Sequence, residues 1–134
     1  MTGYKGKRRK LLVVDDQVEH RSFLLNLLES LGFEVVTAEN GKRGLEITFQ
    51  ILPDLILTDL FMGSISGFGM VQELRQKEEF KDVPIIAATA STFEGVEKEL
   101  RRVGCNAFLR KPIDEKQLLA LLEQYLQLEW VYRV

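Results

Sequence analysis

Two kinds of segment alternate along the chain and differ in the spacing of their apolar positions. Short apolar runs rich in β-branched residues predict strands, and runs such as LLVV (11–14) and PIIAATA (84–90), which are apolar at successive positions, fit burial on both faces of a sheet. Between these runs, apolar residues recur every three or four positions, which predicts helices with one buried face. The five predicted strands cover residues 11–14, 33–37, 55–58, 83–88 and 107–109.

Local signals mark the helix boundaries: glycines, the Asn40-Gly41 turn before the second helix and one capping pair. Gly32 and Gly104 each follow an apolar stripe, in the position where glycine commonly ends a helix. Asp114 and Gln117 have capping-box spacing at the start of the last helix. The predicted helical segments are 23–31, 41–50, 68–77, 96–103 and 114–126.

The order of these segments is strand and helix, repeated five times. Strands that alternate with helices form a parallel sheet with helices on both faces and right-handed connections. The length of 134 residues suits one domain. The sequence therefore predicts a single-domain α/β fold.

Composition narrows the class of protein. Because 46% of the residues are hydrophobic, the chain can build a core and is not of the disordered class. The lone Cys105 excludes a disulfide framework and a cysteine-based zinc site, and it is compatible with a reducing, cytoplasmic location. No apolar run approaches the ~18 residues of a membrane span, so we expect no membrane insertion.

The basic residues are concentrated at the N-terminus. Residues 1–10 hold five of the 18 basic residues and none of the 20 acidic ones, which leaves 13 basic and 20 acidic residues in the remaining chain. We interpret residues 1–9 as a solvated basic tail, 10–128 as the domain, and 129–134 as a C-terminal tail or junction. A nucleic-acid-binding arm is the weaker interpretation, and we expect no nucleic acid binding by the domain itself.

Polar residues follow four of the five predicted strands. Since ligands bind beyond the carboxyl ends of parallel strands, these residues are expected to meet at one edge of the sheet. Taken alone, an Asp after a strand is commonly a helix cap or turn residue, Thr89 would end a strand and Lys111 would be a solvated surface charge, but four such strand ends together favour a site. The four pairs are Asp15-Asp16, Thr58-Asp59, Thr89-Ala90 and Lys111-Pro112.

The residue types then indicate the chemistry. Three neighbouring carboxylates repel one another by about 1 kcal/mol per pair in water and by more near a protein surface, so they must be protonated, pair with a cation or bind a metal. With no Cys or His expected nearby, oxygen ligands favour Mg²⁺. We interpret the site as a metal, a carboxylate nucleophile and the Lys111 ammonium around a phosphoryl group.

These motifs occur in the order and spacing of a known family. The sequence resembles the receiver domain of two-component response regulators over residues 10–128, on Asp15-Asp16, Asp59 in DLFMGSISG, Thr89-Ala90, Phe108 and Lys111-Pro112. The resemblance implies a doubly wound (βα)₅ flavodoxin-like fold with a five-stranded parallel sheet of order 2-1-3-4-5. It also implies a signalling phosphoprotein of phosphorelay signal transduction, with only self-phosphorylation and autodephosphorylation as activity, and not an enzyme.

The resemblance assigns a role to each site residue. Asp59 would be the phosphoacceptor, forming an aspartyl phosphate. The Mg²⁺ ligands would be Asp15, Asp16, Asp59 and the backbone carbonyl of Phe61. The residues that contact the phosphoryl group or switch with it would be Lys111, Thr89, Ala90 and Phe108. Structural roles would fall to Gly67 and to Pro112, whose preceding peptide bond is often cis in this family.

The resemblance also implies partners. A histidine kinase or histidine phosphotransfer domain would donate the phosphoryl group. A downstream protein or fused domain would bind the face formed by the fourth helix, fifth strand and fifth helix. The chain would be a standalone regulator or the receiver of a hybrid histidine kinase. A homodimer is also compatible with the resemblance.

Some positions depart from the family pattern or have no role in it. Gly63 stands where the family commonly has Pro, which should loosen the loop, and the bulky Phe61 lies beside the acceptor. We interpret His20 as an ordinary helix residue, because a phosphodonor histidine needs a helical-bundle context.

Two other classes of protein share part of the pattern. An aspartate-nucleophile phosphatase of the haloacid dehalogenase type would need a second Asp two residues after Asp59, where Phe61 stands. A non-phosphorylated doubly wound module that binds flavin or nucleotide would need backbone amides and hydroxyls in its first loop. Asp15 and Asp16 would instead repel its phosphate.

Overall fold

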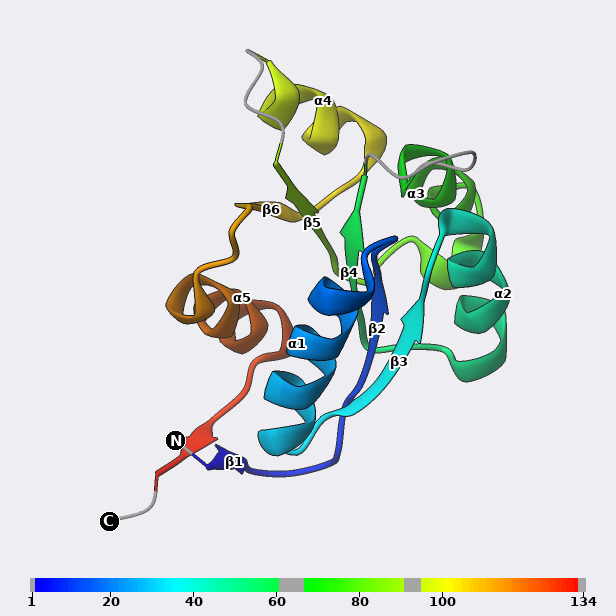
Figure 1. The fold of residues 1–134 in the computed structure, drawn as a ribbon. Coiled ribbons are helices and arrows are strands. Elements are labelled where there is room, and N and C mark those ends of the chain that lie inside the picture. The colour runs from blue at the N-terminus through cyan, green and yellow to red at the C-terminus, as the bar shows by residue number, and fades with distance from the viewer. Residues whose placement is uncertain (1, 61–66, 91–94, 133–134) are drawn as a thin grey trace.

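A five-stranded parallel sheet forms the centre of the molecule. The computed structural model describes residues 2–60, 67–90 and 95–132. The strands are β2 (Lys10–Val14), β3 (Glu34–Ala38), β4 (Leu55–Asp59), β5 (Ile85–Thr89) and β6 (Ala107–Arg110), in the spatial order β3-β2-β4-β5-β6. This is the predicted order 2-1-3-4-5 when the five strands are counted along the chain, so the flavodoxin-like fold is confirmed (Figure 1).

Helices cover both faces of the sheet, as the double-sided burial of the strands requires. The helices are α1 (Val18–Ser30), α2 (Gly41–Ile51), α3 (Gly67–Arg75), α4 (Val96–Val103) and α5 (Glu115–Leu126), with a short 3₁₀ turn, η1 (Glu78–Phe80). The apolar sides of α1 and α5 pack on one face, and those of α2, α3 and α4 on the other. Figure 1 shows α1 and α5 on one side of the sheet and α2 and α3 on the other. Within the described ranges, no helix is long and apolar enough to cross a membrane.

Four helices begin and end within two residues of the predicted segments, whereas α1 begins at Val18, five residues before the predicted segment 23–31, because its first turn precedes the apolar stripe. The Asn40 side chain accepts a hydrogen bond from the Arg43 amide and caps α2, and Asp114 accepts one from the Lys116 amide and caps α5. Gly104 ends α4 with a φ of 113°, a left-handed conformation that glycine adopts without steric cost. These boundaries set where each strand emerges from the core.

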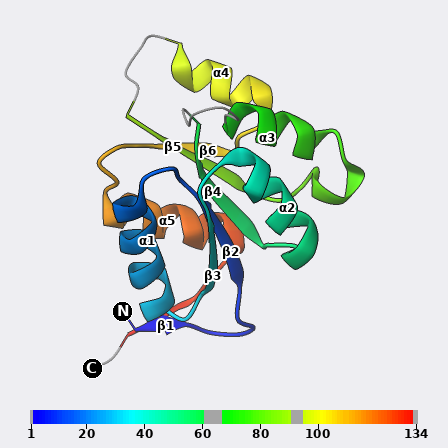
Figure 2. The same cartoon turned by 45° about the vertical axis from the view of Figure 1, so that its right-hand side comes forward.

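The two ends of the chain pair with each other, which the sequence did not predict. β1 (Gly3–Tyr4) and β7 (Trp130–Val131) form a two-stranded antiparallel ribbon, which we call the terminal ribbon. The Tyr4 ring lies 4.6 Å from that of Phe33 and 6.2 Å from that of Trp130, measured between centroids. The terminal ribbon lies at the end of the molecule away from α4 in both views (Figures 1 and 2). Residues 3–4 and 130–131 are thus part of the fold, although they fall in segments interpreted as tails.

Candidate functional site

Four strands bring their polar ends to one edge of the sheet. Asp15 directly follows β2, Asp59 ends β4, Thr89 ends β5 and Lys111 directly follows β6. The strands are in register at this edge, since Asp59 is paired with Ala88 and the Lys111 amide donates to the Thr89 carbonyl at 2.9 Å. The convergence expected from the sequence is therefore present in the structure.

Lys111 lies at the centre of the site. Its Nζ donates to Asp15 Oδ2 and to Asp59 Oδ2, each at 2.8 Å. The three side chains are largely buried, with 10% of Lys111, 4% of Asp15 and 10% of Asp59 exposed. Burial lowers the pKa of Lys111, but the hydrogen bonds and charges of Asp15 and Asp59 outweigh burial, so the pKa is raised above its ordinary value. Lys111 is therefore a fixed cation between two carboxylates at neutral pH.

The backbone holds Asp15 in this position. Its amide donates to the Ala38 carbonyl at 3.0 Å, which extends the pairing of β2 with β3 beyond the last strand residue. Its Oδ1 accepts the Gln17 amide at 2.9 Å, and its carbonyl accepts Arg21 Nη1 at 2.8 Å. Each carboxylate oxygen of Asp15 thus has a donor, and the side chain is fixed before any ligand binds.

Three carboxylates gather beside Lys111. Asp15, Asp16 and Asp59, which we call the carboxylate cluster, each offer one oxygen, and these atoms lie within 4.8 Å of one another. Asp15 and Asp59 are buried, whereas Asp16 is exposed. When all three are ionised, Lys111 offsets only one of their charges, so the site carries an excess of negative charge. A hard divalent cation with oxygen ligands fits both this excess charge and these donor atoms.

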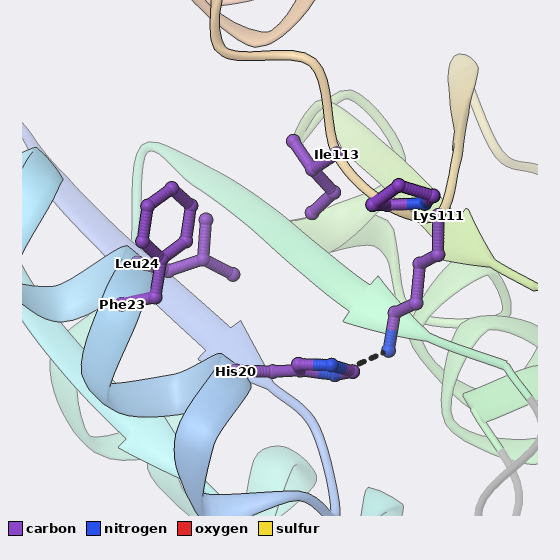
Figure 3. Close-up of a pocket in the computed structure, with 6 residues that line it drawn as sticks. His20, Phe23, Leu24, Lys111 and Ile113 are labelled. Atoms are coloured by element: carbon purple, nitrogen blue, oxygen red, sulfur yellow. Dashed lines mark hydrogen bonds between the residues drawn. The ribbon is translucent and has the colours of Figure 1, made fainter.

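His20 reaches the site, although we interpreted it from the sequence as an ordinary helix residue. It is in the first turn of α1, and its Nδ1 lies 3.0 Å from Lys111 Nζ and 3.3 Å from Asp15 Oδ2. Figure 3 shows the ring directed toward the Lys111 ammonium. The signal was available in the sequence, because a helix that starts two residues after Asp16 keeps its first turn near that strand end.

A pocket opens next to His20 and Lys111. It has a volume of about 230 Å³ and lies between α1 and the loop from β6 to α5 (Figure 3). The Lys111–Pro112 peptide bond in that loop is cis. The pocket is lined by His20, Phe23, Leu24, Lys111, Pro112 and Ile113, so a mostly apolar surface leads to a buried cation.

The two residues of the expected switch are described and lie on one face of the sheet. Thr89 is buried at the end of β5. Phe108 pairs with Ala87, two residues before Thr89, and packs against the core on the side of α4. Since alternate residues of a strand share a face, Thr89 and Phe108 both lie on the α4 side. Ala90 follows β5 and is exposed.

Gly67 leaves room for the backbone that carries Asp59. A Cβ atom at Gly67 would collide with the Asp59 carbonyl oxygen and lie 2.9 Å from Leu60 Cα. The Gly67 amide donates to the Leu60 carbonyl at 3.2 Å, which ties the start of α3 to the end of β4. The expected ligand Phe61 and the departure at Gly63 lie outside the described residues.

Comparison with known proteins points to one family. Residues 11–123 match the response regulator receiver domain family. The chain is 30% identical over 118 residues to the polar-differentiation response regulator DivK of Brucella anthropi. The matched region covers 88% of this chain and 96% of DivK.

Solved structures of similar proteins share the fold. The chemotaxis protein CheY4 of Vibrio cholerae superimposes with a TM-score of 0.83 at 30% identity, over 89% of this chain and 99% of CheY4. The receiver domain of a sensor histidine kinase from Pseudomonas aeruginosa superimposes with a TM-score of 0.82 at 26% identity, over 90% of this chain and 99% of that domain. The latter structure holds a magnesium ion coordinated in its active-site cleft.

Proposed function

The chain belongs to the response regulator receiver domain family, and on this premise we propose that it accepts a phosphoryl group on Asp59 in a Mg²⁺-dependent reaction. Receiver domains are in general signalling phosphoacceptors and not enzymes that turn over a diffusible substrate. The observation that supports the proposal most directly is the contact of Lys111 with Asp59, beside the carboxylate cluster. A nucleophile, a fixed cation and a set of metal ligands are thereby within reach of one phosphoryl group.

Three described residues suit Mg²⁺. Asp15 and Asp16 would hold the ion together with Asp59, and by family resemblance the Phe61 carbonyl would add a ligand. When bound, Mg²⁺ would supply positive charge that offsets the phosphoryl oxygens. Asp16, as the exposed member of the cluster, would be the ligand open to solvent.

The chain's own residues perform the transfer as follows. A carboxylate oxygen of Asp59 attacks phosphorus, the bond from phosphorus to the donor's imidazole nitrogen breaks, and the electron pair stays with the imidazole. Lys111 then exchanges its hydrogen bond to Asp59 Oδ2 for one to a phosphoryl oxygen, while Asp15 Oδ2 keeps the ammonium in place. Because Lys111 is already positioned, this charge stabilisation requires little reorganisation.

The signal would leave the site through the Thr89 and Phe108 side of the sheet. A phosphoryl group adds nearly two negative charges and three acceptors, which attract the Thr89 hydroxyl and the Ala90 amide. The Phe108 ring would follow inward, since it packs on the same side as Thr89. To invert a 1:99 population, these contacts must differ by about 5.5 kcal/mol between the two states. The output face would be α4, β6 and α5.

The partners and location follow from the family. Receiver domains interact with histidine kinases or phosphotransfer proteins and with downstream partners. For this chain we propose a cytoplasmic location, a histidine kinase or phosphotransfer domain as donor, and either a separate protein or a fused domain, as in hybrid histidine kinases, as target. The phosphatase alternative lacks its acid–base carboxylate, because Phe61 stands at that position.

The proposal is tested by phosphorylation with a small acyl phosphate and Mg²⁺, followed by intact-mass measurement. We expect a gain of one phosphoryl group in the wild type and none in Asp59→Asn. An unmodified wild type, or an Asp59→Asn variant that gains the same mass, would contradict the proposal.

Metal binding is tested separately from phosphorylation. Mg²⁺ should raise the melting temperature of the wild type, because binding to the folded state alone stabilises it. Asp16→Ala should abolish this rise, and Glu19→Ala, which removes a nearby exposed carboxylate outside the cluster, should leave it unchanged. An equal rise in all three proteins would place the metal elsewhere.

A further inference from the structure

His20 is the third acceptor of the Lys111 ammonium. The three contacts of Nζ are Asp15 Oδ2 at 2.8 Å, Asp59 Oδ2 at 2.8 Å and His20 Nδ1 at 3.0 Å. An ammonium group has three N–H donors and no acceptor. These three partners therefore account for all the hydrogen-bonding capacity of Lys111.

The geometry also determines the role of the imidazole. Because the ammonium can only donate, Nδ1 must accept with its lone pair, and the ring proton is on Nε2. The 3.3 Å separation of Nδ1 from Asp15 Oδ2 is then the distance between two acceptors that share one donor group. His20 thus accepts from Lys111 beside the two carboxylates.

His20 lies on the ammonium side of the site and not among the metal ligands. Among the described residues, the set of ligand atoms within 4.8 Å of one another comes from Asp15, Asp16 and Asp59, and His20 is not part of it. The ring lines the pocket beside Lys111 and is partly exposed there, at 39% (Figure 3). Any effect of His20 on the reaction is therefore expected through Lys111.

We propose that His20 is a positioning residue that holds the Lys111 ammonium in place for phosphoryl transfer. This inference rests on the proposed function. During transfer, the hydrogen bond from Lys111 to Asp59 is exchanged for one to the phosphoryl group, which leaves Asp15 and His20 as its remaining anchors. Two anchors on different elements, the end of β2 and the first turn of α1, restrict the ammonium more than Asp15 alone. A preorganised cation stabilises developing charge better than a mobile one.

A matched pair of variants separates the acceptor from the ring. His20→Asn keeps an acceptor, Oδ1, at the same number of bonds from Cα as Nδ1. His20→Phe keeps a ring of similar shape and removes the acceptor. The rate of mass gain is measured with a small acyl phosphate at saturating Mg²⁺, and the Mg²⁺ midpoint of thermal stabilisation is measured for each protein.

We expect His20→Phe to be phosphorylated about tenfold more slowly, the ratio that corresponds to one hydrogen bond from a charged donor. The phosphorylation rate of His20→Asn should stay within about twofold of the wild-type rate. The Mg²⁺ midpoint of thermal stabilisation should be the same in all three proteins. A wild-type rate in His20→Phe would overturn the inference. Equal slowing in both variants would overturn it too, because the ring and not the acceptor would then matter.

A second measurement does not depend on phosphorylation. An ammonium held by three acceptors exchanges its protons slowly, so Lys111 should give a resolved ¹H–¹⁵N signal in the wild type and in His20→Asn. In His20→Phe the signal should broaden or disappear, and an unchanged signal there would overturn the inference. Failure of the wild type to gain mass would instead overturn the proposed function, while the Lys111 signal would still decide whether His20 holds the ammonium.

Discussion

The two ends of the sheet are built from different kinds of interaction. At the carboxyl ends of the strands, the carboxylate cluster places like charges within 4.8 Å of one another beside the Lys111 ammonium. At the opposite end, the terminal ribbon packs the rings of Tyr4 and Trp130 against Phe33, a residue with no exposed surface. One end concentrates charge, and the other buries apolar surface.

The difference shows which end of the sheet opposes folding and which end stabilises the folded state. Buried carboxylates that share a cation oppose folding, which supports the proposed binding role of the carboxylate cluster. Aromatic contacts add stability in proportion to the surface they bury, and they need no ligand. Substitutions at the carboxylate cluster should therefore change the phosphorylation rate, and substitutions at the terminal ribbon should change stability.

The largest effect is expected from Lys111→Met. The substitution removes the cation that contacts both Asp15 and Asp59, and the loss of one preorganised charge contact commonly lowers a rate by about 10²-fold or more. The rate of mass gain with a small acyl phosphate measures it. As a control, Lys98→Met removes an exposed lysine on α4 and should leave the rate unchanged. A Lys111→Met protein that is phosphorylated at the wild-type rate would show that the ammonium does not contribute to the reaction.

Much of this end of the molecule could be predicted from the sequence, because local patterns determine it. Residues 55–57 are apolar at successive positions, and all of β4 is buried. The polar residues that follow such runs then meet at the carboxyl edge by topology alone. His20 lies three residues before Phe23 and four before Leu24, so it shares their side of the helix, and it was missed because it was judged only as a possible phosphodonor.

The terminal ribbon could not be predicted, for a different reason. Its strands are two residues long and lie more than 120 positions apart, as the pairing of Tyr4 with Trp130 shows. Two residues are too few for a periodic pattern, and the surrounding basic residues suggested a solvated tail. The local signals were Tyr4, an aromatic residue in a polar segment, and the apolar residues 130–132 near the other end of the chain.

The second prediction concerns stability at the ribbon. Tyr4→Ala should lower the free energy of unfolding by about 2 kcal/mol, because the ring contacts with Phe33 and Trp130 are lost. Phosphorylation of the folded protein should be unchanged. Denaturant unfolding measures the free energy of unfolding, and the gain in intact mass measures phosphorylation. Tyr132→Ala is the matched control, since Tyr132 is 64% exposed, and it should change stability by less than about 0.5 kcal/mol. Equal losses in the two variants would contradict a specific role for Tyr4.

A smaller effect is expected from Tyr4→Phe. The ring stays, but the hydroxyl no longer donates to the Gly32 carbonyl or accepts the Arg9 amide. We expect a loss of about 1 kcal/mol in the free energy of unfolding, measured by denaturant titration. If Tyr4→Phe were as unstable as Tyr4→Ala, the hydroxyl and not the ring would hold the ribbon.

The smallest change in stability is expected from a change of pH, because burial and hydrogen bonding act on the pKa of Lys111 in opposite directions. The net pKa in the folded protein is raised above its ordinary value of 10.5. The contribution of Lys111 to stability is therefore fully present below that value, and it is lost as pH rises through the folded-state pKa. Burial also raises the pKa of the Cys105 thiol, from 9.0 to about 11, so Cys105 lowers stability over the same alkaline range.

A Cys105→Ala background isolates the lysine. Denaturant unfolding from pH 9 to pH 11 is measured for Cys105→Ala and for the Cys105→Ala/Lys111→Met double variant, in which the other titrating groups cancel. The single variant should lose stability more steeply above about pH 10.5 than the double variant. Parallel curves would show that the carboxylates do not stabilise the Lys111 charge. The site would then have to keep its ammonium in place by packing alone, as the terminal ribbon keeps its rings.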